Sequence, residues 1–542
     1  MKKITFLLLF MLMGSIAFSQ NFTHQDSLRG SITPERAWWN LTQYDLAIEV
    51  QPEARFIQGT NTVSYEVVAQ NNVMQIDLQP PMQLDKVIQD GTELSFTSEG
   101  NAHFIQLQKK QKKGDNNKLT LYFSGKPRVA RRAPWDGGFS WEKDSNRKHF
   151  IATSNQGIGA SIWWPNKDHP YDEPENGLNL AITAPADLVG VGNGRLIKTE
   201  AKGDQKTWQW KVVNPINNYG VNINIGDYVH FGEKYKGLKG ELDLDYWVLR
   251  ENEAKAKEQF KQVPMMLEAF EYWFGAYPFY EDSFKLVEVP YLGMEHQSSV
   301  TYGNKYRNGY LGNDLSRTGW GLKFDFIIIH EAAHEWFANN ITNIDVADMW
   351  IHEGFAAYSE NLYLDYHFGK EASSAYVIGT RNMIQNDRPI IGAYGVQNEG
   401  SSDMYYKGAN ILHTIRQLIE DDEKWRAILV GLNKDFYHQT VSSKQLEDYI
   451  AAKKGIHMNE FWDQYLRTTM VPLLVYKVDG NTLQFRYEEI VENFDMPVIA
   501  VVNGKEEWIF PAAEWKTQVF SEPIKDIAIK KDFYVNSERL KK

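Results

Sequence analysis

The sequence of 542 residues contains no cysteine. Disulfide bonds and a lipid-modified cysteine anchor are therefore excluded, and stability has to come from packing and bound metal. Basic residues are also in the minority, 58 against 70 acidic residues, which gives a formal net charge of -12. Binding to the phosphates of nucleic acid needs a basic surface, so we do not expect nucleic acid as a partner.

Long apolar runs are scarce, and the clearest one lies at the start of the sequence. Lys2 and Lys3 precede an almost wholly apolar stretch, 4–13, and a small-x-small site follows at 17–19. This order predicts a secretory signal peptide over residues 1–19. The stretch is too short to span a bilayer, and no later segment predicts a transmembrane helix. We therefore expect a protein exported by a bacterium, either periplasmic or secreted.

The patterns of apolar residues divide the rest of the chain into three domains. Residues 20–240 alternate as strands do, residues 241–470 show mostly helical spacing, and residues 471–542 return to strands. We interpret Asn193-Gly194, Asp90-Gly91 and the lysine-rich stretch 109–114 as hairpin turns. The sequence therefore predicts a multidomain α+β protein with a β domain, a mostly helical domain and a small β-sandwich-like domain.

The middle domain contains His-Glu-Ala-Ala-His at 330–334, within a segment, 324–340, that we predict to be helical. On a helix His330 and His334 project from one face, as two ligands of one zinc ion require. Glu331 lies where a general base for a zinc-activated water would sit. A hydrogen-bonded pair of core histidines is the alternative. Histidine is scarce in this chain, 13 of 542 residues, and the motif therefore favours zinc.

Glu353 is the predicted third zinc ligand, because a catalytic zinc takes three protein ligands and one water. Eighteen residues separate it from His334. That interval allows the first helix to end, the chain to turn back and a second helix, 351–366, to bring the carboxylate to the imidazoles. Glu360 lies on the same face of this second helix. It either hydrogen-bonds a ligand imidazole or is a surface carboxylate.

These residues resemble peptidase family M1, the gluzincin aminopeptidases, which include aminopeptidase N and leukotriene A4 hydrolase. The resemblance rests on His330–Trp336 and Trp350–Ala356 and covers most of residues 30–470. His352 and Glu335 replace the usual Asn and Gln, and neither position is a metal ligand. The family implies a saddle-like N-terminal β domain, a thermolysin-like catalytic domain and one zinc ion per chain.

A further segment resembles the substrate-binding motif of the family. Leu292–His296 is similar to Gly-x-Met-Glu-Asn, although its first and last residues differ. The glutamate of this motif, here Glu295, would bind the free α-amine of the substrate. Gly293 and Met294 would also contact the substrate, and Met294 would form a wall of the first side-chain pocket.

Two weaker matches complete the predicted site. Tyr405–Gly408 resembles the Tyr-x-Lys-Gly stretch of the family, which assigns the catalytic tyrosine to Tyr405 and leaves Tyr406 as the second choice. Gln156 resembles a glutamine of the N-terminal domain that lines the amine-binding pocket.

The resemblance implies a zinc-dependent aminopeptidase that hydrolyses the N-terminal residue from peptides through a zinc-activated water. Glu331 would move protons, Tyr405 would stabilise the oxyanion, and Glu295 with Gln156 would select peptides with a free N-terminus. Too few residues follow 470 for the long helical C-terminal domain of many members. Two alternatives therefore stay open, a zinc endopeptidase with an open cleft and an inactive exported peptide-binding protein.

Overall fold

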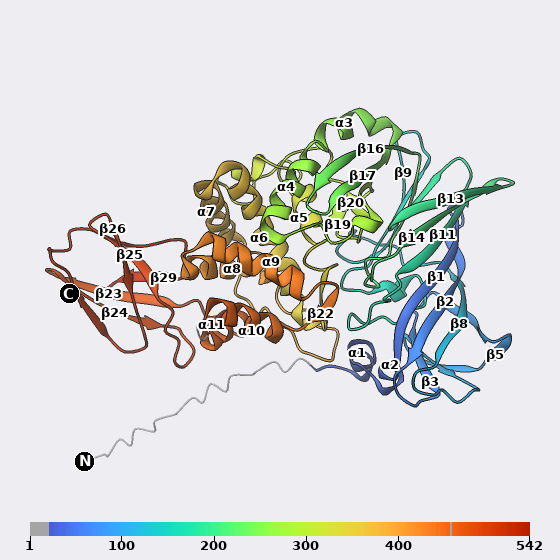
Figure 1. Ribbon diagram of the computed structural model, residues 1–542, viewed down its shortest axis with the longest axis horizontal. Helices are drawn as coiled ribbons and strands as arrows, with labels where there is room; N and C mark the ends of the chain where they lie inside the picture. The colour runs from blue at the N-terminus through green and yellow to red at the C-terminus, as the bar shows by residue number, and fades with distance from the viewer. Residues whose placement is uncertain (1–20, 456–457, 542) are drawn as a thin grey trace, which may run out of the picture.

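The computed structural model describes residues 21–455 and 458–541, so the predicted signal peptide lies outside the described residues. Figure 1 shows three parts in a row along the longest axis. A β-rich N-terminal part lies at one end, a mostly helical part lies in the centre, and a β module built from the end of the chain lies at the other end. This arrangement confirms the predicted multidomain α+β fold.

The N-terminal part is built on an eight-stranded sheet with the order β13-β14-β11-β1-β2-β8-β4-β5. Its long central strands, β1 and β2, pair antiparallel from Trp39 opposite Val67 to Gln51 opposite Phe56. Side chains of β1 and β2 alternate between buried and less buried positions along much of their length, which is why alternation in the sequence predicted strands here. The strands of this sheet are β1 (Trp39–Gln51), β2 (Phe56–Val67), β4 (Gln83–Gln89), β5 (Thr92–Leu94), β8 (Asn116–Gly125), β11 (Leu178–Pro185), β13 (Arg195–Lys202) and β14 (Gln205–Val212).

Two smaller sheets complete this part, with the orders β12-β15-β10-β9 and β3-β7-β6. In the first of these two sheets, strand β10 ends at Ser154, two residues before Gln156. This sheet therefore positions Gln156, which the N-terminal part contributes to the site. The strands are β3 (Val73–Asp77), β6 (Phe96–Glu99), β7 (Ala102–Gln106), β9 (Gly138–Lys143), β10 (His149–Ser154), β12 (Val189–Gly192) and β15 (Ile223–Gly226).

One of the three predicted hairpin turns joins strands that pair with each other: Asp90-Gly91 lies between β4 and β5, which are antiparallel. Residues 109–114 connect β7 to β8, and Asn193-Gly194 connects β12 to β13, in each case across two different sheets. The hairpin interpretation was therefore confirmed at Asp90-Gly91 and wrong at the other two positions. A turn motif reverses the chain locally, but the partner of the next strand is chosen by non-local packing.

The central part contains a five-stranded sheet with the order β16-β17-β18-β20-β19, in which β19 is an edge strand. Strands β16 and β17 form an antiparallel hairpin on either side of residue 240. The domain division predicted at that residue therefore falls inside a hairpin of this sheet. The strands are β16 (Tyr228–Gly237), β17 (Gly240–Leu249), β18 (Phe284–Glu288), β19 (Gly293–Met294) and β20 (Val300–Tyr302).

Helix α5 (Phe326–Ala333) carries the His-Glu-Ala-Ala-His motif and is shorter than the predicted 324–340. Asp325 caps its start by accepting from the backbone N–H groups of Ile327 and Ile328. His334 is the C-cap residue of this helix, and the chain later turns through Ala338, whose φ is 149°. The other helices are α1 (His24–Gly30), α2 (Pro34–Ala37), α3 (Glu253–Gln259), α4 (Gln262–Phe274), α6 (Trp350–Phe368), α7 (Lys370–Gly379), α8 (Tyr406–Ile419), α9 (Asp422–Asp435), α10 (Ser443–Lys454) and α11 (Asn459–Leu466), and a two-stranded sheet pairs β21 (Ile341–Asn343) with β22 (Gln439–Val441).

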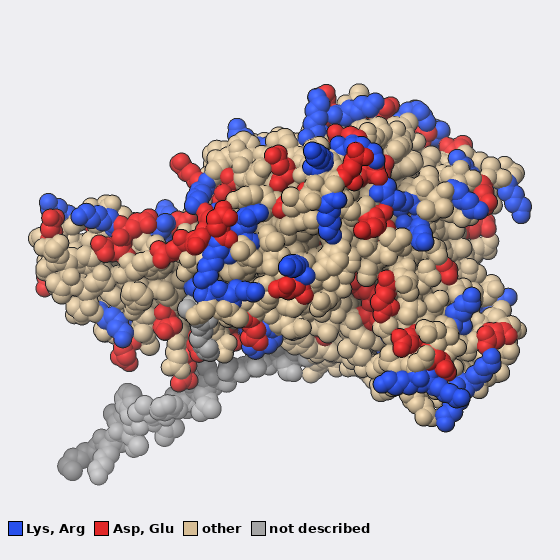
Figure 2. Space-filling view, viewed as in Figure 1, with Lys and Arg blue, Asp and Glu red and all other residues tan. Residues whose placement is uncertain are grey.

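The C-terminal module consists of two sheets with the orders β27-β24-β23-β29 and β26-β25-β28. Its apolar side chains belong to the same core as those of the central helices, so the module is packed onto them. Charged side chains crowd the seam between α7, α8 and the module (Figure 2). Within the described residues, no helix combines the length and apolar character needed to cross a membrane. The strands are β23 (Leu473–Asp479), β24 (Thr482–Glu488), β25 (Val498–Val502), β26 (Lys505–Ile509), β27 (Lys516–Val519), β28 (Ile527–Ile529) and β29 (Asn536–Arg539).

Candidate active site

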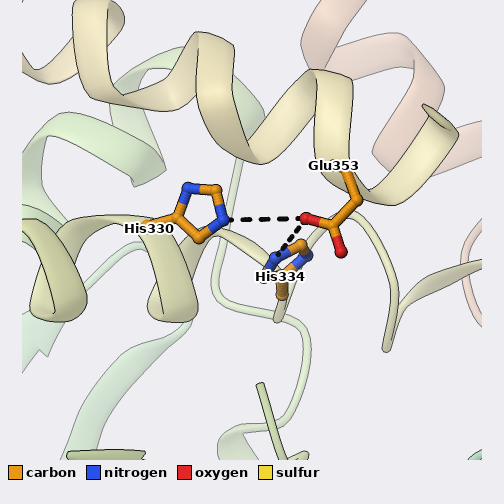
Figure 3. A group of neighbouring side chains, drawn as sticks. All are labelled: His330, His334 and Glu353. Carbon is orange, nitrogen blue, oxygen red and sulfur yellow. Dashed lines mark ion pairs between the residues drawn. The ribbon is translucent and has the colours of Figure 1, made fainter. Parts of the chain in front are cut away.

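The three predicted zinc ligands meet between α5 and α6. Glu353 Oε2 lies 3.6 Å from His330 Nε2 and 3.4 Å from His334 Nε2, as Figure 3 shows. The two histidines come from the last turn and the C-cap of α5, and Glu353 comes from the first turn of α6. All three side chains are buried. The spacing read from the sequence therefore brings two imidazoles and one carboxylate to a single point.

Hydrogen bonds on the far side of each imidazole fix the ring so that Nε2 faces inward. The Nδ1 atom of His330 lies 2.8 Å from Glu360 Oε1, and the Nδ1 atom of His334 lies 3.0 Å from the Phe337 carbonyl. Of the two roles predicted for Glu360, the structure confirms the hydrogen bond to a ligand imidazole. Such outer contacts set the tautomer that a metal-binding histidine needs.

The atoms present fit one zinc ion. Glu353 Oε2 is buried and accepts no hydrogen bond from the described residues, a costly state that a bound cation relieves. Two imidazole nitrogens and one carboxylate oxygen lie within 4.8 Å of one another, which is the donor set of a catalytic zinc with one position left open. Burial acts to raise the pKa of Glu353, but His334 and His330 outweigh it and hold that pKa below its usual value.

Glu331 lies beside this group, on the side of α5 that faces β19. A β-carbon added to Gly293 would lie 3.1 Å from Glu331 Oε1, so the strand passes the carboxylate at close range. Burial raises the pKa of Glu331, which makes the carboxylate a better proton acceptor than an exposed one. The structure therefore brings the predicted base and the predicted substrate-binding strand together.

The predicted amine pocket is formed by residues from both large domains. Gln156 Nε2 donates to Glu295 Oε1 and to Glu353 Oε1, each at 2.7 Å. One amide therefore links the carboxylate proposed to bind the substrate amine to the third zinc ligand. Burial raises the pKa of Glu295, and the carboxylate of Glu353 adds to this effect.

Tyr219 is a member of this pocket that the sequence analysis missed. Its hydroxyl lies 3.4 Å from His352 Nδ1, and the nearby Glu295 carboxylate adds to the effect of burial in raising the pKa of this phenol. His352 Nε2 accepts from the Asn343 backbone N–H at 2.8 Å, so the ring proton is on Nδ1 and points to the Tyr219 oxygen. His352, which replaces the usual Asn of the family, thus orients Tyr219 toward Glu295. Tyr219 is 133 residues from His352, and no local motif signals the contact.

Tyr405 faces the zinc group, with its ring parallel to that of His330 at a centroid distance of 6.0 Å and an angle of 20°. Burial, together with the nearby carboxylates of Glu353 and Glu295, raises the pKa of Tyr405 well above its usual value. The phenol therefore keeps its proton and can donate it as a hydrogen bond. Tyr406 also lines the cavity, but its pKa is affected first by burial and then by Glu360, on the outer side of His330.

Helices α6 and α8 cross at two glycines close to the site. A β-carbon on Gly408 would lie 2.8 Å from the Gly354 α-carbon, so the two backbones touch directly. Gly354 follows the zinc ligand Glu353, and Gly408 lies three residues after Tyr405. This contact sets the separation between the helix that holds the carboxylate and the helix that begins at the tyrosine.

The site opens into a cavity of about 200 Å³. Met294 and Gly293 lie on one wall, as predicted, and Trp135 and Pro134 reach it from a loop of the N-terminal part. Trp135 has 64% of its surface exposed, which marks it as the mouth of the cavity. The sequence analysis did not single out Trp135, because an isolated tryptophan in a loop carries no motif.

The sequence matches two family models of known peptidases. The Peptidase M1 N-terminal domain matches residues 41–219, and the Peptidase family M1 domain matches residues 258–465. The fold and the three-ligand site are those of a gluzincin zinc peptidase. The chain belongs to peptidase family M1.

Individual relatives are distant. Probable aminopeptidase 1 of Sulfurisphaera tokodaii is 21% identical over 454 residues, 79% of this chain and 54% of that protein. A leucyl aminopeptidase of Saccharolobus solfataricus is 20% identical over 414 residues, 70% of this chain and 50% of that protein. This chain therefore spans about half the length of the curated relatives it matches.

Among solved structures, an M1 zinc metallopeptidase from Deinococcus radiodurans with a bound Tyr-Ser-Ala substrate aligns with a TM-score of 0.69. The alignment covers 82% of this chain and 98% of that chain at 18% sequence identity. This similarity establishes the shared fold.

Proposed function

We propose that this chain is a zinc aminopeptidase that removes the N-terminal residue from peptides. The observation that carries the proposal is the Gln156 amide, which bonds to Glu295 and to the zinc ligand Glu353 at the same time. A substrate ammonium held by Glu295 would then lie about one residue away from the metal. The names of the aminopeptidase relatives are consistent with this function.

The chemistry divides between the metal and the protein. When bound by His330, His334 and Glu353, zinc supplies a Lewis acid that polarises a carbonyl and acidifies water. Glu331 takes the proton of the attacking water and passes it to the nitrogen of the leaving peptide. Because Glu331 is buried, its carboxylate is poorly solvated and accepts that proton readily.

The remaining side chains stabilise charge and position the substrate. The Tyr405 phenol donates a hydrogen bond to the oxyanion, where negative charge develops only in the transition state. Glu295 pairs with the α-ammonium, while Gln156 donates to its carboxylate and the neighbouring Tyr219 hydroxyl helps to hold it in place. The distance from Glu295 to the metal group then restricts cleavage to the first peptide bond.

The test compares leucyl-anilide with N-acetyl-leucyl-anilide on the zinc-loaded protein. We expect hydrolysis of the free amine only, because an acetylated nitrogen carries no charge for Glu295 to bind. Equal rates on both would favour an endopeptidase with an open cleft. Tight binding of peptides without hydrolysis would favour an inactive peptide-binding protein.

We also propose that the protein is exported, with residues 1–19 as its signal peptide. The basic start, the short apolar stretch and the small-x-small site support this proposal, and the lack of cysteine is compatible with it. N-terminal sequencing of the protein recovered from the periplasm and medium of an expressing bacterium checks it. A chain that begins at Gln20 is expected, whereas an uncleaved chain confined to the cytoplasm would contradict it.

A further inference from the structure

We propose that a hollow next to the active site binds the C-terminal carboxylate of short peptides, so that short peptides with a free C-terminus are the preferred substrates. This proposal rests on the aminopeptidase function and names the substrate class of the same site. The hollow, called the outer cleft below, has a volume of about 560 Å³ and is lined by both Trp135 and Leu292. The same two residues line the active-site cavity, so the two spaces adjoin.

Strand β19 fixes the direction in which a bound peptide leaves the zinc group. It is the edge strand of its sheet, so one side of its backbone is available to pair with an extended peptide. Glu295 follows the strand, Gly293 passes beside Glu331, and Leu292 precedes the strand. Since a strand advances about 3.3 Å per residue, the substrate amine, the scissile bond and the residues after it follow in this order. The residues after the scissile bond therefore enter the outer cleft.

Three exposed cationic side chains, Lys255, Lys305 and Arg307, line the outer cleft. None of them forms an ion pair within the part of the chain that the structure describes. The acidic residue of the lining, Glu288, is buried, and its two oxygens accept from the Leu249 backbone N–H at 2.8 Å and from an amide N–H at 2.7 Å. The cleft therefore offers unneutralised positive charge in a chain whose net charge is -12.

The charged seam at the C-terminal module differs from the outer cleft in this respect. That seam encloses a larger set of charged groups in a cavity of about 440 Å³. Its three cations all have acidic partners: Lys370 pairs with Asp422, Arg416 with Asp365 and Lys530 with Glu506. Of these two hollows, the outer cleft is therefore the one whose lysine and arginine side chains are free to pair with an anionic ligand.

The loop that carries two of these cations is held in a fixed shape. Lys305 and Tyr306 both have a φ of 55°, in the left-handed region that such residues rarely adopt. The buried Asn304 amide donates to the Arg307 carbonyl at 2.7 Å, and the Tyr306 backbone N–H donates to the Tyr302 hydroxyl at 2.9 Å. A preformed loop loses little freedom when it binds a ligand, which favours a specific contact with a carboxylate.

The substrate test compares Leu-Gly-Gly with its C-terminal amide on the zinc-loaded protein. Loss of the carboxylate should lower kcat/KM about five- to tenfold, mainly through a higher KM, as expected for exposed charge pairs acting together. Salt screens such pairs, so the ratio should shrink at about 0.5 M NaCl. Equal kcat/KM for Leu-Gly-Gly and its amide would overturn the proposed carboxylate site. If leucyl-anilide is still hydrolysed in that case, the aminopeptidase function stands.

The variant test removes the cations that line the cleft. The double variant Lys305→Gln and Arg307→Gln should reduce the preference for the free carboxylate to within about twofold and leave leucyl-anilide hydrolysis unchanged. Lys202→Gln with Lys236→Gln removes the same charge at exposed positions elsewhere and should keep the preference. A preference that survives in the first variant would overturn the site. Failure of the wild type to hydrolyse leucyl-anilide would instead overturn the aminopeptidase function.

Discussion

Glu331 is the residue whose replacement separates chemistry from metal binding. Glu331→Gln keeps the size of the side chain but removes the proton acceptor, while His330, His334 and Glu353 remain to hold zinc. We expect kcat to fall about 10²- to 10⁴-fold with an unchanged zinc content, measured by metal analysis and leucyl-anilide hydrolysis. Activity close to that of the wild type would exclude Glu331 as the base.

The adjacent residues Tyr405 and Tyr406 provide a matched pair of variants that tests which hydroxyl stabilises the oxyanion. Tyr405→Phe removes the donor to the oxyanion and should lower kcat about 10²- to 10³-fold with little effect on KM. Tyr406→Phe removes a neighbouring hydroxyl that points toward the outer side of His330 and should change kcat much less. If Tyr406→Phe showed the larger loss of kcat, the roles of the two tyrosines would be reversed.

Tyr219 offers a test of the amine pocket that does not touch the metal. Tyr219→Phe removes the hydroxyl that lies between the Glu295 carboxylate and His352, so Glu295 loses a polar neighbour that orients it. A polar contact of this kind is worth roughly 0.5–1.5 kcal/mol, so KM for leucyl-anilide should rise about two- to tenfold. Tyr291→Phe is the control, because the Tyr291 hydroxyl donates to the Thr153 carbonyl. An unchanged KM in Tyr219→Phe would show that Glu295 needs no such support.

The metal-binding residues could be predicted from the sequence because they depend on local spacing. His330 and His334 share a helical face, and a single reversal of the chain after this helix brings Glu353 to them. The predicted bond between Glu360 and a ligand imidazole is confirmed as well. Tyr219 and Trp135 could not be predicted, since they come from loops of the N-terminal part and only tertiary packing brings them to the site.

Among the helices, α5 depends most on a single buried cap. Asp325 accepts from the Tyr302 hydroxyl, the Gln259 amide and the Asn304 amide, in addition to the helix N–H groups. Burial raises the pKa of Asp325 to about 6 from an unfolded value near 3.8. A carboxyl that holds its proton more tightly in the folded chain stabilises the fold most below pH 4. That contribution is lost as the pH rises through 6.

The Asp325→Asn variant tests this pH dependence. It lacks this titratable carboxyl, so its free energy of unfolding relative to wild type should increase by roughly 2 kcal/mol between pH 4 and pH 6 and change little above pH 7. Urea unfolding followed by tryptophan fluorescence measures the difference. A difference that is flat over this range would show that Asp325 titrates normally.

The helices of the site differ in how closely their bounds follow the sequence pattern. Helix α6 at 350–368 has close to the predicted bounds of 351–366, and Gly369 follows its end. Helix α5 ends seven residues before the predicted end at 340. Its apolar pattern continues past Ala333, but the chain after the helix brings the Phe337 carbonyl to 3.0 Å from His334 Nδ1. Tertiary contacts override local periodicity at that point.

Zinc should raise the stability of the molecule, because its ligands and the carboxylates around them are buried. Glu295, Glu331 and Glu353 are buried close together, and removal of the cation leaves their charges uncompensated. Chelation should therefore lower Tm by several degrees, and added zinc should restore it. Zinc at a thousand times its Kd adds about 4 kcal/mol to the free energy of unfolding. Glu353→Gln should weaken the response of Tm to zinc. A Tm that does not change on chelation would mean that the fold is complete without metal.

The C-terminal module lies apart from the cavities around the metal group, whose described lining residues all precede residue 407. It instead holds the far half of α8, where His413 lies 2.9 Å from Asp532 and the Trp508 indole donates to Glu420 at 2.9 Å. The near end of the same helix begins at Tyr405. The module therefore acts on the site through the placement of α8.

The glycine crossing of α6 and α8 has an evolutionary consequence. Because a β-carbon on Gly408 would lie 2.8 Å from the Gly354 α-carbon, a methyl group there would push the helices apart and draw Tyr405 away from Glu353. A β-carbon on Gly354 would meet its nearest atom at 3.2 Å, so that position is less restricted. Divergent sequences that keep activity should therefore retain the glycine at 408, whereas a lineage that has lost peptidase activity is free to replace it. The residue at this position is thus a marker that separates active from inactive members among otherwise similar chains.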